Sequence, residues 1–284
     1  MTLEIYYKDS RKMSEVNDRM IQTIITSPPY WNIKKYSEKK IDSEIGYGQT
    51  YEEYLEALRE VWIESRRVLR DNGTLWINIG NKFNGGHFYP IAYDILSQVK
   101  ELGFNLRNII VWYKPNALPI HSNDNLTNKY EEILFFSKTD SYKFYKDRIR
   151  VPQIYFGKDW GGRDYKMNPK GKDPGNVWKY SPRKGNLSPK LGHPAPFPKF
   201  IPERVIRVTT DANDWVLDPF LGSGTTLEVC KQMDRSGIGY EINPVFKDLI
   251  EAKLGLKTKS LMDFPIHRPS ETARISEATS PSTH

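Results

Sequence analysis

The chain has 284 residues, of which 38% are hydrophobic and 13% aromatic, and its formal net charge is +7. These values allow one large α/β domain with an inserted module, and they exclude a chain too polar to fold. It has no apolar run of about 18 residues and no signal-peptide layout at its N-terminus, and its single cysteine, Cys230, excludes an internal disulfide. Together these features predict a soluble protein of the reducing cytoplasm, without a membrane span.

The pattern of apolar residues predicts alternating strands and helices. In chain order we expect a strand at 5–7, a short helix, a strand at 23–26, a helix at 51–70, a strand at 74–79, a helix at 89–101, strands at 108–113 and 132–136, a helix at 198–209, a strand at 215–217, a helix at 225–233, a strand at 237–240 and a helix at 244–254. The helix at 51–70 should stop at Asp71-Asn72-Gly73. Such alternation favours a mostly parallel sheet covered on both faces.

Positive charge is concentrated in one stretch, 139–192, which holds 13 Lys/Arg and 5 Asp/Glu, a net charge of +8. The rest of the chain therefore sums to −1. Basic side chains can neutralise phosphates, and interleaved aromatics can stack on bases. The alternative is a loop-rich insertion whose aromatics form a small local core. The nine aromatics are Tyr142, Phe144, Tyr145, Tyr155, Phe156, Trp160, Tyr165, Trp178 and Tyr180.

A glycine-rich turn follows the predicted strand at 215–217. Asp218 comes directly after this strand, Gly222-Ser223-Gly224 follows, and Glu241 closes the next strand. The glycines let the backbone approach a ligand, and an acid at the tip of the second strand can accept two ribose hydroxyls. No lysine follows the glycines, and Asp218 repels phosphate but can pair with an ammonium or a hydroxyl. The pattern indicates a cofactor with an amino acid and a ribose but no phosphates; the alternative is an ordinary strand–helix turn.

A second motif, Ser27-Pro28-Pro29-Tyr30, follows the predicted strand at 23–26. Its prolines fix two φ angles and leave rigid carbonyls, which together with a hydroxyl can hold the two N–H bonds of an amino group on a base. Tyr30 offers a flat face for an extruded base. The alternative is a rigid proline turn with packed aromatics.

In this order the motifs resemble those of the amino-group DNA methyltransferases of the permuted β class, over about residues 3–260 apart from the insertion. The family's cofactor motif is similar to Asp218 through Thr226, and the segment that closes over the cofactor is similar to His193-Pro194-Ala195-Pro196-Phe197-Pro198. Tyr7-Lys8-Asp9-Ser10 resembles the stretch with the acid that meets the adenine amino group. Asn108 through Pro119 resembles a further stretch typical of these enzymes.

The resemblance implies a Rossmann-like S-adenosylmethionine-dependent methyltransferase fold with circularly permuted motif order and an inserted basic target-recognition region. It implies a catalytic half at 1–138, the insertion at 139–192 and a cofactor-binding half at 193–262, while the Ser, Thr, Pro and charged residues of the tail at 263–284 predict disorder. Catalytic residues are then Ser27, Pro28, Pro29 and Tyr30. Cofactor-binding residues are Asp9, Ser10, Pro196, Phe197, Asp218, Phe220, Gly222, Ser223, Gly224, Thr225, Glu241 and Ile242.

The expected reaction is methyl transfer from S-adenosyl-L-methionine to a cytosine N4 in double-stranded DNA, because Ser27 and the segment at 193–198 resemble the cytosine branch. Adenine N6 remains the first alternative, since Asp or Asn is usual there at the position of Ser27. A catalytically silent DNA-binding protein, or a methyltransferase for RNA or protein amides, is a further alternative. The resemblance also implies a restriction–modification context, in which a companion endonuclease forms no stable complex. The recognition site and the choice between monomer and homodimer stay open.

Cytosine C5 methylation is disfavoured on independent grounds, because it needs a thiolate nucleophile. The only thiol, Cys230, lies inside a predicted core helix and is interpreted as a small buried hydrophobe. No metal site is expected, since His87, His121 and His193 are scattered along the chain.

Overall fold

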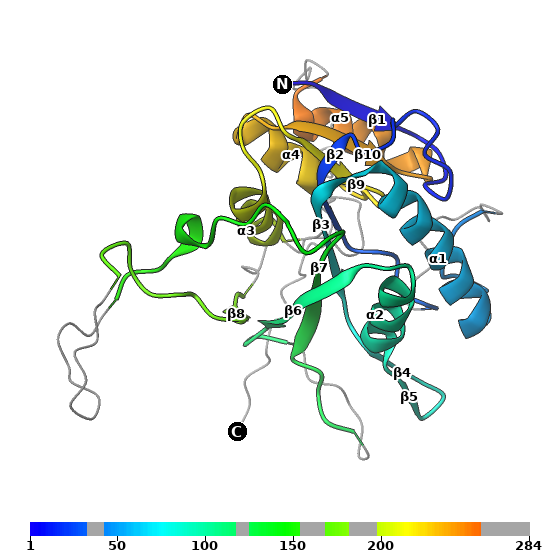
Figure 1. Ribbon diagram of the computed structural model, residues 1–284. Helices are drawn as coiled ribbons and strands as arrows, with labels where there is room; N and C mark the ends of the chain where they lie inside the picture. Colours follow the sequence, from blue (N-terminus) through cyan, green and yellow to red (C-terminus); the bar gives the residue numbers. More distant parts are fainter. Residues whose placement is uncertain (33–42, 118–124, 154–167, 182–197, 257–284) are drawn as a thin grey trace, which may run out of the picture.

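The computed structural model describes residues 1–32, 43–117, 125–153, 168–181 and 198–256. Within them a large sheet forms the centre of the molecule (Figure 1). Its strands lie in the order β1 (Leu3–Tyr6), β10 (Ser236–Tyr240), β9 (Trp215–Asp218), β2 (Ile21–Thr26), β3 (Leu69–Ile79), β7 (Tyr130–Ser137), β6 (Asn105–Tyr113) and β8 (Val177–Lys179). A separate hairpin pairs β4 (Lys82–Asn84) with β5 (His87–Tyr89).

The sheet is parallel except for β7, which runs antiparallel to both β3 and β6. This confirms the mostly parallel sheet predicted from the alternating pattern. From the centre the chain proceeds in opposite directions, from β9 to β10 on one side and from β2 to β3 on the other. The β9/β2 boundary is therefore a topological switch point, where ligands of open α/β sheets bind beyond the carboxyl ends of the strands.

Helices cover both faces of the sheet, because successive side chains of each strand point to opposite faces. Ile24 packs in the cluster that contains α1 (Tyr51–Val68) and α2 (Ile91–Glu101), while its neighbour Ile25 packs with α3 (Phe200–Thr209) and α4 (Thr225–Gln232). A last helix, α5 (Lys247–Leu254), follows the 3-10 turn η3 (Pro244–Phe246) and packs against α4. Among the residues described, no helix has both the length and the apolar composition of a membrane span.

Local signals explain the best-predicted helix and the main errors. Thr50 and Glu53 form a capping box at the start of α1, which ends at Val68 close to the predicted boundary. The predicted stop at Asp71-Asn72-Gly73 is wrong, because β3 begins at Leu69 and runs through these residues. The short helix predicted between the first two strands is also wrong, since residues 7–20 form turns. The hairpin β4–β5 and strand β8 were not predicted.

The described part of the basic stretch 139–192 is docked onto the sheet domain. Its 3-10 turn η1 (Lys146–Ile149) lies beside α3, and β8 extends the main sheet next to β6. Tyr142, Phe144, Trp178 and Tyr180 pack in or against the cluster built on α3. For these four aromatics the local-core interpretation therefore holds. Tyr155, Phe156, Trp160 and Tyr165 lie outside the described residues, as do Pro196, Phe197 and the tail at 263–284.

Most described cations of this stretch form ion pairs with carboxylates. Lys143 pairs with Asp211 at 3.0 Å and with Asp214 at 2.7 Å, and Arg148 pairs with Asp211 at 2.7 Å. Within the stretch, Lys146 pairs with Asp173, while Arg150 and Lys170 pair with Asp147. Many of the cations that the composition predicts to contact phosphates thus attach this segment to the loop between α3 and β9 and to itself.

Candidate active site

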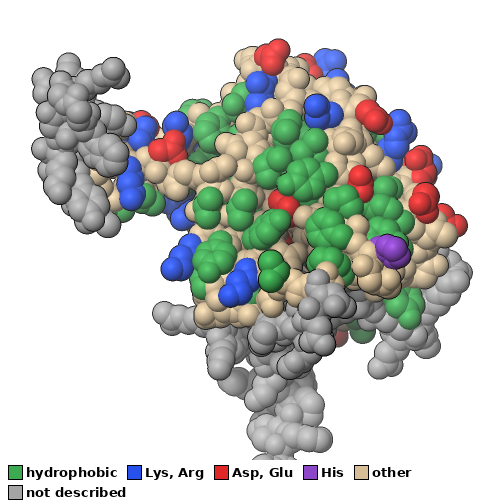
Figure 2. All heavy atoms as spheres, turned by 90° about the horizontal axis from the view of Figure 1, so that it is seen from below, with side chains coloured by type: hydrophobic (Ala, Val, Ile, Leu, Met, Phe, Trp, Pro, Cys, Tyr) green, Lys and Arg blue, Asp and Glu red, His purple; other side chains and the backbone are tan. Residues whose placement is uncertain are grey.

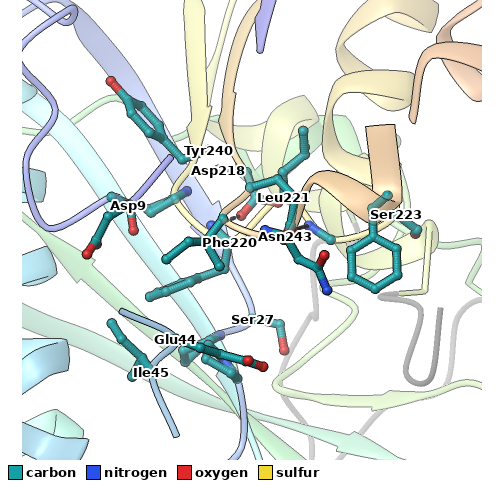
Figure 3. Close-up of a pocket in the computed structure, with 18 of the residues that line it drawn as sticks. Asp9, Ser27, Glu44, Ile45, Asp218, Phe220, Leu221, Ser223, Tyr240 and Asn243 are labelled. Carbon is teal, nitrogen blue, oxygen red and sulfur yellow. Dashed lines mark hydrogen bonds between the residues drawn. The ribbon is translucent and has the colours of Figure 1, made fainter. Parts of the chain in front are cut away.

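The two motif segments predicted from the sequence line one pocket at the switch point (Figure 3). Its empty volume, with the open mouth included, is about 950 Å³. One wall comes from the residues after β2, and the other comes from the turn between β9 and α4 and from the end of β10. Figure 3 shows Ser27 and Glu44 across the pocket from Asp218 and Leu221.

Asp218 is the buried anchor that joins the two walls. Its carboxylate accepts hydrogen bonds from the Thr26 hydroxyl at 2.7 Å, the Thr226 hydroxyl at 2.5 Å and the Phe220 N–H at 3.1 Å. Burial raises the pKa of Asp218 to about 6, against the lowering effect of these three donors. Thr26 ends β2 and Thr226 lies in the first turn of α4, so this carboxylate fixes the loop across the switch point. The sequence predicted that Asp218 can pair with an ammonium or a hydroxyl, and its described partners include two hydroxyls, which order the loop between β9 and α4.

Glu241, at the end of β10, faces the same pocket. Its two oxygens accept the N–H groups of Gly222 and Asn243, both at 2.8 Å. Burial raises the pKa of Glu241 to about 7, the hydrogen bonds oppose this shift, and nearby Asp218 and Glu44 add to it. A buried carboxylate with a raised pKa binds hydroxyl donors or a positive charge, since either stabilises its ionised form.

The glycine turn has the backbone geometry that its composition predicts. Gly222 and Gly224 adopt φ values of 53° and 81°, in the left-handed region. Gly222, Ser223 and Thr225 line the pocket, whereas Gly224 is the N-cap of α4. The side-chain hydroxyls of Ser223 and Thr225 accept hydrogen bonds from Lys253 of α5, each at 3.1 Å. The first two residues of α4, Thr225 and Thr226, line the pocket, so the start of this helix lies at the pocket wall.

Four carboxylate side chains line this pocket: Asp9, Glu44, Asp218 and Glu241. Asp9 is bound by Arg11, whose guanidinium and backbone N–H both donate to it. Ser10 and Ile242 also line the pocket, as predicted, and Phe220 lies opposite Ile45. Such a lining disfavours a ligand with phosphates and fits one that carries positive charge and hydroxyls.

The segment Ser27–Tyr30, which the sequence predicts to be catalytic, forms one wall of the pocket, which we call the catalytic wall. Tyr54 of α1 donates from its hydroxyl to the Pro29 carbonyl at 3.0 Å, so this carbonyl is already engaged. In the described part of the chain no hydrogen bond ends on the Pro28 carbonyl. The Tyr30 ring lies against Gly80, where an added Cβ would come within 3.4 Å of it. The wall thus presents one hydroxyl, one carbonyl and one aromatic ring.

A polar chain behind Ser27 was missed from the sequence. Asn78, buried at the end of β3, donates from Nδ2 to Glu131 Oε2 at 2.6 Å and lies 3.5 Å from the Ser27 hydroxyl. Glu131 in turn pairs with Lys114. No local motif marks these residues, because only the pairing of β2, β3 and β7 brings them together. The sequence feature that could have pointed to them is the presence of polar residues, Asn78 and Glu131, near the ends of apolar strands.

The remaining predictions concern residues that should take no part in chemistry. Cys230 is fully buried in α4, and burial raises the pKa of its thiol well above its usual range. A thiol in this environment is not a nucleophile. Among the described residues there is no cluster of His, Cys, Asp and Glu that could hold a metal ion.

Comparison with known proteins gives consistent matches along the chain. A family model described as DNA methylase matches residues 21–252. Type II methyltransferase M.BglII of Bacillus subtilis is 34% identical over 268 residues, covering 92% of this chain and 71% of that protein. The solved PvuII DNA methyltransferase (cytosine-N4-specific) matches with a TM-score of 0.70 at 22% identity, covering 89% of this chain and 86% of that chain.

A Thermus thermophilus protein solved in complex with S-adenosyl-L-methionine matches with a TM-score of 0.63 at 24% identity. This match covers 90% of this chain and 95% of that chain. The sheet order and these structural matches confirm the predicted Rossmann-like methyltransferase fold.

Proposed function

The chain belongs to the DNA methylase family, and on that premise we propose that it methylates the exocyclic N4 amino group of cytosine in double-stranded DNA. It is a DNA methyltransferase of the restriction–modification type, and its cofactor is S-adenosylmethionine. The observation that supports the proposal most directly is the shared pocket, in which the Ser27 segment faces the Asp218–Glu241 edge.

The residues of the pocket fit this cofactor. Glu241 is placed at the strand tip to accept ribose hydroxyls, and Asp9 and Ile242 lie beside it for the adenine. The four carboxylates of the lining favour a molecule that carries a sulfonium and an ammonium. The N–H groups at the start of α4 suit its carboxylate. When bound, S-adenosylmethionine supplies a methyl group activated by its positively charged sulfur.

The catalytic wall prepares the nucleophile. The lone pair of a cytosine amino group is delocalised into the ring, so the group must be pulled toward a tetrahedral geometry before it can attack. Ser27 Oγ and the Pro28 carbonyl accept its two N–H bonds and direct the lone pair to the opposite side. Tyr30 holds the extruded base by its ring face. As the nitrogen–carbon bond forms and the sulfur–carbon bond breaks, the nitrogen loses a proton to solvent or through Ser27.

Ser27 is the basis for proposing cytosine. Its neutral hydroxyl is held next to Asn78, and Asn78 is tied to the Glu131–Lys114 pair. A serine can accept one N–H bond and donate its own proton to the adjacent ring nitrogen, whereas a carboxylate can only accept. Adenine also has a ring nitrogen beside its amino group, so adenine N6 is the alternative outcome of the test.

The test is mass spectrometry of nucleosides after the protein acts on unmethylated genomic DNA with isotopically labelled S-adenosylmethionine. The expected product is labelled N4-methylcytosine. Labelled N6-methyladenine would refute the choice of base and leave the reaction class intact. Absence of label from both nucleosides, with cofactor binding detected by calorimetry, would overturn the proposal in favour of a catalytically silent DNA-binding protein.

A further inference from the structure

A small hairpin beside the catalytic wall exposes two aromatic side chains. In β4–β5, Phe83 pairs with Phe88, and their ring centroids lie 5.0 Å apart. Phe83 is 39% exposed and Phe88 is 51% exposed. The turn between them, Gly85-Gly86, has positive φ at both residues and no heavy atom within 4 Å of an added Cβ. The tip therefore stands free of the described residues, and Figure 1 shows it projecting below α2.

The base of this hairpin is attached to the catalytic segment. Lys82 donates to the Trp31 carbonyl at 2.8 Å, and the Tyr89 ring lies 4.6 Å from the Trp31 ring. Gly80, two residues before β4, contacts the Tyr30 ring. Trp31 directly follows Tyr30, so the position of the hairpin is fixed relative to the residue that holds the extruded base.

Two more exposed aromatics, Tyr93 and Tyr130, lie close to each other, since Tyr93 adds to the rise that burial and Glu132 cause in the pKa of Tyr130. Tyr93 on the first turn of α2 is 50% exposed, and Tyr130 at the start of β7 is 40% exposed. Seen from below, the molecule has hydrophobic side chains gathered over one broad face (Figure 2). Exposed apolar groups gathered beside a site mark an interaction surface.

Extruding a base leaves a gap in the stack of the duplex, and unstacking costs a few kcal/mol. Aromatic and aliphatic side chains that wedge between base steps offset this cost in proteins that distort DNA. We propose that the hairpin β4–β5 enters the duplex beside the target base, with Phe83 and Phe88 filling the gap that extrusion leaves. This inference rests on the proposed function, because it names the element that opens the DNA for the Ser27–Tyr30 site.

The test compares two duplexes that contain the methylation site found by sequencing the products of the wild-type protein. One duplex is fully paired, and the other carries a mismatch opposite the target base, which lowers the cost of extrusion. For the double variant Phe83→Ala/Phe88→Ala we expect the single-turnover rate to fall about 10- to 100-fold on the paired duplex and less than about threefold on the mismatched one. With a fluorescent cytosine analogue that pairs with guanine at the target position, the variant should lose the fluorescence increase that extrusion causes in the paired duplex.

Equal losses on both duplexes, or no loss on either, would overturn the hairpin's role. Calorimetry of S-adenosylmethionine binding by the same variant shows whether the pocket is intact, and Phe83→Leu/Phe88→Leu should restore most of the rate if the double alanine variant is unstable. Ile63→Ala removes a 44% exposed side chain on α1 and should leave both rates unchanged. A wild-type protein that methylates no DNA would refute the proposed function instead, so the two failures are distinguishable.

Discussion

The two charged regions of this protein, the acidic pocket at β9 and β10 and the basic stretch 139–192, use their charges in opposite ways. Carboxylates line the open space of the pocket. Burial raises the pKa values of two of them, Asp218 and Glu241. In the described part of the basic stretch, Lys143 and Arg148 are neutralised by Asp211 and Asp214. In the pocket, Asp218 and Glu241 accept hydrogen bonds from hydroxyls and backbone N–H groups, whereas in the basic stretch the cations form ion pairs that hold the scaffold together.

The difference shows what kind of sequence feature predicts a site. The pocket was predicted from residue type at fixed positions relative to strand ends, and backbone geometry constrains such positions strongly. The basic stretch was predicted from composition, which says nothing about which cations find partners within the protein. Of its described cations, Lys172 and Lys179 are exposed and form no ion pair among the described residues.

The largest expected effect comes from Asp218→Asn. Two hydroxyls and one N–H donate to this carboxylate, and an amide would direct its own N–H₂ at one of these donors. An unsatisfied buried donor costs about 1–3 kcal/mol, so we expect the free energy of unfolding to fall by roughly 2–4 kcal/mol. This carboxylate orders the loop between β9 and α4 that lines the pocket. The affinity of the Asp218→Asn variant for S-adenosylmethionine should therefore fall about 100-fold. Urea denaturation and calorimetry measure the two effects.

Thr209→Val provides the control for Asp218→Asn. Thr209 of α3 accepts a buried hydrogen bond from Thr23 of β2 at 2.8 Å, and it does not line the pocket. Its loss should reduce stability while leaving cofactor affinity within about threefold, since the loop between β9 and α4 keeps its own hydrogen bonds. Equal loss of affinity in both variants would show that Asp218 acts only through general stability.

The second prediction concerns the pH dependence of cofactor binding. Glu241 has its pKa raised to about 7 in the free protein, and accepting ribose hydroxyls favours its ionised form. Cofactor binding should therefore lower this pKa and release a proton. Affinity is then expected to rise about tenfold between about pH 6 and pH 8. Calorimetry in two buffers with different ionisation enthalpies measures the proton release.

The amino group of the cofactor also titrates, but it does so equally with the wild-type protein and with Glu241→Gln. Comparing the pH dependence of cofactor affinity in these two proteins therefore isolates the contribution of Glu241. The variant should bind more weakly and lose the rise in affinity with pH. A rise that persists in Glu241→Gln would assign the titration to another group, with Asp218 as the next candidate.

The smallest expected effect is on the salt dependence of DNA binding. It should differ between cations of the basic stretch that form ion pairs and cations that form none among the described residues. Replacing Lys172 and Lys179 with Ala should reduce the slope of log affinity for DNA against log salt by about 0.9 per lost phosphate contact. Arg148→Ala should leave the slope nearly unchanged, because this guanidinium binds Asp211 and the Thr210 carbonyl and lies 3.8 Å from the Tyr145 ring. Its loss should cost about 1 kcal/mol of stability.

These slopes can be measured by fluorescence anisotropy over a series of KCl concentrations. A larger slope change for Arg148→Ala than for the lysine pair would reverse the assignment of paired and free cations.

Strong periodicity and strand-end motifs made most of the fold predictable. The helix at 51–70 and the strands around Asp218 and Glu241 were found because each has a long apolar pattern or a glycine turn. Strand β8 could not be found from the sequence, because its three residues join the sheet only by pairing with β6, which is far away in the sequence. The hairpin β4–β5 has equally short strands, and Asn84-Gly85-Gly86 was its one turn signal.

The site shows the same division. Ser27, Asp218 and Glu241 can be recognised from their neighbours in sequence, whereas Asn78 and Glu131 can be recognised only from their positions in space. Asn78 reaches Ser27 because β2 and β3 pair in register, with Thr26 opposite Ile77. Glu131 reaches Asn78 because β7 enters the sheet antiparallel beside β3. Long-range strand pairing of this kind cannot be obtained from local spacing.

The division of the pocket into a catalytic wall and a cofactor edge is tested most directly with Ser27→Ala. The measurement is the single-turnover rate of methyl transfer at saturating cofactor, with the Kd for S-adenosylmethionine determined on the same preparation. Removing one positioned hydrogen-bonding group should lower the rate about 100-fold or more, while the Kd changes less than about threefold. An unchanged rate, or a rate and affinity that fall together, would contradict the assignment of Ser27 to the chemistry.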